Sequence, residues 1–181
     1  MGRAAVVTGQ RATLQEYLEL PGEFRAEFVH GVIVVNPPPS FTHQRACLCL
    51  RDMLVANLPR AVVAVAVGWR LHPDRDDVRI PDVCVLSNEP DTDLLTAPPL
   101  VVVEVLSSNR SDDLVRKSTE YLEATAGQYW IIDPRDHVLD AYLNTPTGWE
   151  VLAHLTDDNP AGTVEIPGLG PVPLDLALLL S

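Results

Sequence analysis

Short apolar runs rich in β-branched residues alternate along the chain with clusters of glycine, proline and aspartate. Such runs are typical of strands, and the clusters between them are typical of turns. The pattern predicts strands at residues 25–28, 32–35, 61–71, 78–86, 100–106, 128–132, 137–143 and 149–155. Neighbouring runs predict three hairpins, within residues 25–35, 61–86 and 137–155.

Two longer segments have apolar positions at helical spacing. They predict helices at residues 41–58 and 111–126, the second capped by Ser111 or Asp112. A capping-box sequence at residues 13–16 predicts a further, short helix.

The run at residues 100–106 lacks polar alternation, so we expect a buried strand at the centre of a sheet. Strands and helices in this order predict an α/β or α+β fold with a central mixed sheet flanked by helices. We expect residues 1–181 to form a single domain, with a flexible tail at residues 1–10 and a core at about 13–155. Residues 156–181 are rich in glycine and proline and are expected to be a C-terminal extension.

The formal net charge of −12 argues against a protein that holds nucleic acid through a broad basic surface. Any contact with DNA would have to be local, metal-assisted or transient. The excess of acid could equally serve solubility.

The three cysteines have neither disulfide nor zinc-site spacing, and we interpret them as reduced core residues. The N-terminus has no signal-peptide pattern and no apolar run approaches the ~20 residues of a membrane helix. The expected location is the cytoplasm, without a membrane partner.

Two carboxylates stand inside apolar segments, where a charge is unfavourable unless it has a partner. Glu104 lies among valines, and Asp82 follows Pro81 in another predicted strand. Lys117 and Tyr121 are four residues apart, on a helix face that can turn back towards Glu104. Two such carboxylates on neighbouring strands indicate a Mg²⁺ site, in which a lysine would stand beside the metal-bound water.

Each of these residues also has a structural interpretation. Asp82 alone is consistent with a turn residue at a strand end, and Tyr121 with a packing residue whose hydroxyl is hydrogen-bonded. His43 is expected near the start of its helix as a cap-region residue or a neighbour of the site. A buried ion pair between Glu104 and Lys117 would use the same side chains without a metal or a reaction.

The order of these groups resembles the PD-(D/E)XK nuclease superfamily, in which a Pro-Asp pair and a second acid precede a lysine. A narrower resemblance, over about residues 13–150, is to the Uma2 family of restriction endonucleases. The residues that carry it are Val103-Glu104-Val105-Leu106-Ser107, Asp113-Leu114, Lys117, Tyr121 and Tyr129-Trp130-Ile131-Ile132-Asp133-Pro134.

The resemblance implies a restriction-endonuclease-like core and hydrolysis of phosphodiester bonds with Mg²⁺ or Mn²⁺. It implies Asp82, Glu104 and the Val105 carbonyl as metal ligands, with Lys117 supplying an amine from the helix and Glu27 an acid near the metal. Two departures stand out. Leu106 occupies the commonest position of the superfamily's lysine, and the hairpin reads His30-Gly31-Val32 where the family often has Asp-Gly-Glu.

Three functions are compatible with these observations. The first is a metal-dependent DNA endonuclease that acts as a homodimer, because cutting both strands requires two sites. The second is a catalytically inactive nuclease-fold module that binds a partner or a DNA end, with Glu104 and Lys117 as a structural ion pair. The third is another metal-dependent phosphoesterase or a small-molecule hydrolase that uses the same acids.

Overall fold

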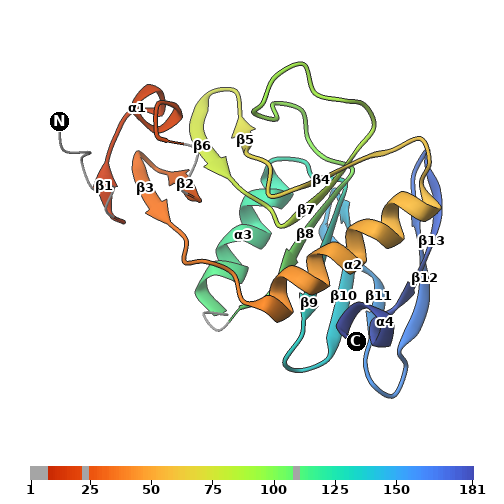
Figure 1. The fold of residues 1–181 in the computed structure, drawn as a ribbon. Coiled ribbons are helices and arrows are strands. Elements are labelled where there is room, and N and C mark those ends of the chain that lie inside the picture. Colours follow the sequence, from red (N-terminus) through yellow and green to blue (C-terminus); the bar gives the residue numbers. More distant parts are fainter. Residues whose placement is uncertain (1–7, 22–24, 108–110) are drawn as a thin grey trace.

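The computed structural model describes residues 8–21, 25–107 and 111–181, which form a mixed α and β fold (Figure 1). In chain order its elements are β1 Gln10–Arg11, α1 Leu14–Leu18, β2 Ala26–Val29, β3 Val32–Val35, α2 Phe41–Asn57, β4 Val62–Val65, β5 Trp69–His72, β6 Arg75–Arg79, β7 Val83–Leu86, β8 Val101–Val105, α3 Ser111–Glu123, β9 Gln128–Asp133, β10 Val138–Thr145, β11 Gly148–Leu155, β12 Ala161–Ile166, β13 Gly170–Asp175 and α4 Leu176–Leu180.

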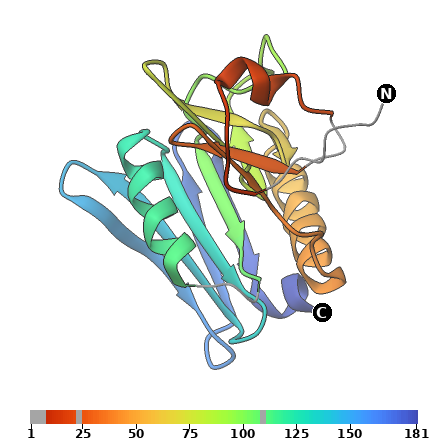
Figure 2. The same cartoon turned by 90° about the vertical axis from the view of Figure 1, so that its left-hand side faces the viewer.

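The centre of the fold is a six-stranded sheet with the order β11-β10-β9-β8-β7-β4, counted over the described residues. Strands β8 and β9 are parallel and the other neighbours are antiparallel, so the sheet is mixed, as predicted. Helix α2 covers one face and α3 the other (Figure 2). The α/β (α+β) class with flanking helices is therefore confirmed.

Strand β8 contributes to both faces because its side chains alternate. Val101, Val103 and Val105 belong to the hydrophobic cluster that includes α2. Val102 belongs to the second cluster, which includes Tyr121 of α3. Glu104 shares the parity of Val102, so its carboxylate leaves the sheet on the α3 side.

A second, five-stranded sheet has the order β1-β3-β2-β6-β5 within the described chain. The single strand predicted at residues 61–71 was wrong, because it is two strands in two sheets. Ala66, with a φ of 53°, interrupts it, and β4 then pairs with β7 while β5 pairs with β6. Residues 78–86 divide in the same way, and Ile80, Pro81 and Asp82 form the break between β6 and β7.

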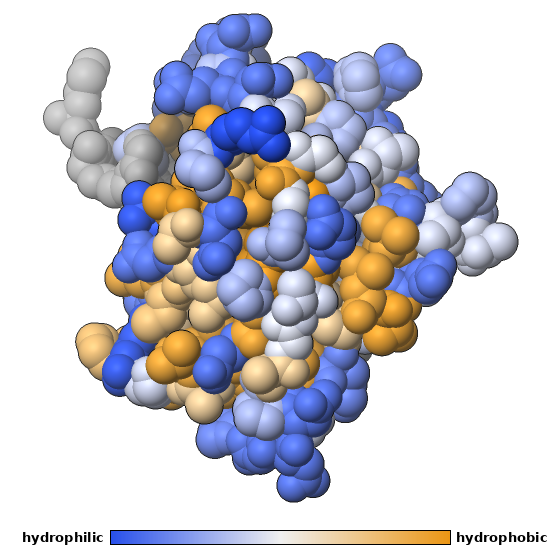
Figure 3. Space-filling model, turned by 90° about the vertical axis from the view of Figure 1, so that its right-hand side faces the viewer, coloured by the Kyte–Doolittle hydropathy of each residue, from blue (hydrophilic) through white to orange (hydrophobic). Residues whose placement is uncertain are grey.

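Both ends of the described chain contain secondary structure. Gln10 and Arg11 pair with β3, whereas residues 1–7 lie outside the described part. Strands β12 and β13 form a hairpin followed by α4, and both contribute buried side chains to the α2-side core. On this side of the molecule apolar patches alternate with hydrophilic ones (Figure 3).

The cysteines agree with the prediction of reduced core residues. Cys47 and Cys84 are buried, Cys49 is half-buried, and all three thiols are free. Among the helices of the described residues, none has the length and apolar character needed to cross a membrane.

Candidate functional site

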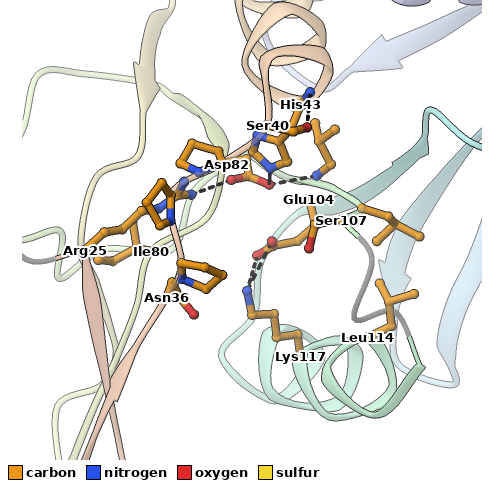
Figure 4. A pocket seen from close by; sticks show the side chains of 15 residues that line it. Arg25, Asn36, Ser40, His43, Ile80, Asp82, Glu104, Ser107, Leu114 and Lys117 are labelled. Atoms are coloured by element: carbon orange, nitrogen blue, oxygen red, sulfur yellow. Dashed lines mark hydrogen bonds and ion pairs between the residues drawn. The ribbon is translucent and has the colours of Figure 1, made fainter. Parts of the chain in front are cut away.

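A cavity of about 430 Å³ opens where the two sheets, the start of α2 and the side of α3 meet (Figure 4). Its walls come from five segments of the chain that are distant in sequence. The polar side chains in its lining are Arg25, Asn36, Ser40, His43, Asp82, Glu104, Ser107 and Lys117.

Asp82 reaches this cavity because Pro81 interrupts the chain just before β7. The last paired residues of β7 and β8 are Val83 and Val103, and beyond them the Val105 N–H donates to Asp82 Oδ2 at 2.8 Å. The Asp82 carboxylate thus accepts the hydrogen bond that a backbone carbonyl of a neighbouring strand would otherwise accept. Asp82 is 4% exposed and is held across the end of β8.

Two further groups fix the Asp82 carboxylate. Arg25 approaches Oδ1 at 2.6 Å, and His43 Nε2 approaches Oδ2 at 3.0 Å. Burial alone would raise the pKa of Asp82. The hydrogen bond and charge of His43, the Val105 N–H and Arg25 outweigh burial and hold this pKa below its ordinary value.

Glu104 faces α3, where Lys117 and Tyr121 stand one turn apart. Lys117 Nζ lies 3.1 Å from both Glu104 oxygens, and the Tyr121 hydroxyl donates to Oε1 at 2.7 Å. Burial raises the pKa of Glu104 to about 7, with Asp82 and Glu27 adding to the rise and Lys117 opposing it. Tyr121 also stacks on Trp69, so its predicted packing role with a bonded hydroxyl is confirmed.

Behind this pair lies a second set of buried charges. Glu27, on β2, is 3.3 Å from Lys117 Nζ and accepts from Arg79 at 2.9 Å. Arg79 also donates two hydrogen bonds to Glu120 at 2.7 and 2.8 Å, and its guanidinium is fully buried. Lys117 therefore connects the cavity to an ion-pair network that joins the two sheets to α3.

His43 is held by its own helix. Ser40 caps α2 and accepts from the His43 N–H at 3.2 Å, while one turn later Cys47 Sγ lies 3.6 Å from His43 Nδ1. Burial, with Asp82 adding to it, raises the pKa of the Cys47 thiol to about 12, so the thiol remains protonated. The ring is thereby fixed between a neutral thiol on one edge and Asp82 on the other.

The donor set fits a divalent cation. Four carboxylates, Asp82, Glu104, Glu27 and Glu120, meet three cations, Arg25, Arg79 and Lys117. The cluster therefore retains one excess negative charge if every acid is ionised and His43 carries no charge. Burial is the largest cause of the raised pKa of Glu104, and the nearby carboxylates of Asp82 and Glu27 add to it. Asp82, Glu104 and the Val105 carbonyl offer the oxygen ligands that Mg²⁺ and Mn²⁺ take.

The structure places most of the predicted site residues together. Asp82, Glu104, Val105 and Lys117 line one cavity, whereas Glu27 contacts Lys117 from behind and is not among the lining residues. The side chain of Asp113, on the same predicted helix face as Lys117, lies outside the described residues.

Sequence reasoning missed two partners of these acids, Arg25 and Arg79. It expected His43 as a cap-region residue or a neighbour of the site, and in the structure His43 follows the Ser40 cap and contacts Asp82. Arg79 had a detectable signal, because it stands with Asp82 inside the apolar segment predicted at residues 78–86, where a charge requires a partner. Arg25 had none, since the contact spans 57 positions in the sequence.

Comparison with known proteins gives one family and one fold. The model of the Uma2 family, described as "Putative restriction endonuclease", matches residues 14–177. A crystal structure described as a putative nuclease belonging to DUF820, from Anabaena variabilis ATCC 29413, superimposes with a TM-score of 0.72 at 20% identity and covers 93% of this chain and 97% of its own. The search of curated proteins found no match.

Proposed function

The chain belongs to the Uma2 family, and we propose that it is a Mg²⁺- or Mn²⁺-dependent endonuclease that hydrolyses DNA phosphodiester bonds. The observation that carries the proposal is the convergence of Asp82, Glu104 and Lys117 on one cavity. Nuclease-like character agrees with the family and with the fold of the matched structure.

Each residue has a definite task in this proposal. Asp82, Glu104 and the Val105 carbonyl would hold the ion, which supplies a water of lowered pKa and polarises a phosphoryl oxygen. Lys117, whose Nζ is 3.1 Å from Glu104, would stabilise the charge that develops at the scissile phosphate. Glu27 would keep Lys117 in place, since it contacts the same Nζ at 3.3 Å.

The cavity also provides the local cationic contacts that an acidic protein needs to bind DNA. Arg25 lines it, and a second cavity of about 260 Å³, which shares Ser40, His43, Leu106 and Ser107 with the first, ends at the exposed Arg135. Phosphate groups are the natural ligands of such arginines. We propose a homodimer as the unit that cuts both strands, which light scattering in solution tests directly.

The decisive experiment is a nicking assay on supercoiled plasmid with Mg²⁺ or Mn²⁺. We expect the wild type to nick and Glu104→Gln to lose nicking. Glu89→Gln makes the same chemical change at an exposed loop position and should behave as wild type. Equal nicking by wild type and Glu104→Gln would show contamination or a different site.

Two observations favour a second function, binding without cleavage. Lys117 and Glu104 already form a complete buried pair in the structure, and the net charge is −12. A nuclease-fold module that binds a partner or DNA end without cutting would have the same contacts. In that case the wild type would shift DNA on a gel, or capture a partner, without nicking at any concentration of either ion.

A further inference from the structure

The imidazole of His43 lies next to Asp82 at the candidate metal centre. Its side chain is 8% exposed, it lines the cavity, and its Nε2 lies 3.0 Å from Asp82 Oδ2. Two ligands in adjacent positions around an ion, each about 2.1 Å from it, are separated by about 3 Å. In the structure this contact is a hydrogen bond, and its length also matches the spacing of two ligands in adjacent positions on one ion.

Arg25 and Lys117, the other nitrogen-bearing side chains at these acids, are cations and cannot bind a metal ion. A neutral imidazole can, provided that its free nitrogen faces the ion and its other nitrogen carries the proton. Cys47 is compatible with an imidazole that carries its proton on Nδ1. Its thiol lies 3.6 Å from Nδ1, and sulfur accepts a hydrogen bond from an Nδ1–H as well as donating one.

His43, Cys47 and Asp82 also lie close enough together to suggest a three-ligand site of their own, since their ligand atoms are within 4.8 Å of one another. The ring geometry argues against it. Cys47 faces Nδ1 and Asp82 faces Nε2, which are opposite edges of one ring, so a single ion cannot use all three in their present positions. Cys47 instead orients the imidazole, as outer groups of metal-bound histidines do.

We propose that His43 is a direct ligand of the active-site ion and makes the site select a first-row transition ion, Mn²⁺ or Co²⁺, over Mg²⁺. The inference rests on the proposed function, because Asp82 is the shared ligand. Mg²⁺ binds oxygen almost exclusively, whereas the affinity of a site that contains nitrogen rises along the first-row transition ions from Mn²⁺ to Co²⁺. The physiological cofactor of this nuclease would then be a transition ion.

Calorimetric titration of the metal-free protein with Mn²⁺ and with Mg²⁺ tests this selectivity. We expect the ratio of the Mg²⁺ to the Mn²⁺ Kd to fall about 10-fold in His43→Gln, within the range that loss of such a group costs. Gln keeps a donor for Asp82 and offers oxygen in place of nitrogen, so Mg²⁺ binding should change little. His154→Gln is the matched control, since His154 pairs with Asp140 at 2.6 Å on the exposed surface.

Pulsed electron paramagnetic resonance of the wild type with Mn²⁺ provides a readout that needs no variant. We expect a coupling from a directly bound imidazole nitrogen that disappears in His43→Gln and persists in His154→Gln. If both ions bind the wild type with a ratio unchanged by His43→Gln, or without nitrogen coupling, the ligand role of His43 is refuted while the metal site stands. If neither ion binds, or Glu104→Gln binds as tightly as the wild type, the metal site and the proposed function both fail.

Discussion

Replacing Lys117 with Met separates the structural and catalytic roles of this lysine. Its Nζ lies 3.1 Å from Glu104 and 3.3 Å from Glu27, and its side chain is 8% exposed. Coulomb's law at an effective dielectric constant of about 20 gives about 5 kcal/mol for each pair. The several kcal/mol needed to desolvate the ammonium offset part of this, and breaking such a buried cluster costs ~3–5 kcal/mol.

We therefore expect Lys117→Met to lower the free energy of unfolding by ~3–5 kcal/mol at pH 8. The loss should be smaller at pH 5.5, because Glu104, whose pKa is already about 7, then takes up a proton and leaves less uncompensated charge. Urea melts at the two pH values measure both quantities. Arg45→Met removes the same charge from an exposed position on α2 and should change stability by less than ~0.5 kcal/mol.

Metal then distinguishes the two functions. If an ion binds at Asp82 and Glu104, a concentration of 100 times the Kd should return up to about 2.7 kcal/mol to Lys117→Met. Nicking should stay lost, because the ammonium acts mainly in the transition state. A stability loss below ~1 kcal/mol at pH 8 would refute the buried ion pair. Stabilisation by Mn²⁺ that is equal in Glu104→Gln would refute binding at this site.

Three further changes test other parts of the structure. The pKa of Glu104 rises from 4.5 to about 7 on folding, so the wild type should lose up to ~3 kcal/mol of stability relative to Glu104→Gln as the pH rises from 4.5 to 7. Urea melts of both proteins across that pH range measure this loss. A difference in unfolding free energy between wild type and Glu104→Gln that stays constant with pH would contradict the raised pKa. Arg79→Met leaves Glu27 and Glu120 without their shared cation and should lower the free energy of unfolding by ~3–5 kcal/mol, measured by a urea melt. A loss under ~1 kcal/mol would contradict the ion-pair network. Gly127→Ala would place a Cβ 2.6 Å from the Leu100 carbonyl oxygen and should lower the free energy of unfolding by ~1–3 kcal/mol. An unchanged melting temperature would show that the backbone relaxes around this contact without cost.

Local sequence patterns predicted the secondary structure well because the determinants are local. Ser40 caps α2, Thr13 and Glu16 form the capping box of α1, and the apolar run around Glu104 is a buried strand. The division of residues 61–71 between two sheets was missed. It depends on a left-handed Ala66, and nothing in the local sequence favours that conformation.

The site was predictable only in part, for a related reason. Glu104 and Lys117 are 13 residues apart on consecutive elements, so a buried acid and the helix that follows it suffice to pair them. The contacts of Asp82 with Arg25 and His43 join segments 57 and 39 residues apart and depend on how the second sheet meets α2. Such packing is a tertiary property that periodicity does not encode.

Anomalous diffraction from a crystal soaked in Mn²⁺ shows whether Asp82 and Glu104 hold a catalytic ion. We expect a peak between the two carboxylates and within ligand distance of the Val105 carbonyl. The crystal is soaked at an Mn²⁺ concentration that saturates binding in solution. A map that shows no peak between Asp82 and Glu104, and in which the Lys117–Glu104 and Arg25–Asp82 pairs are intact, would contradict a metal site at these residues.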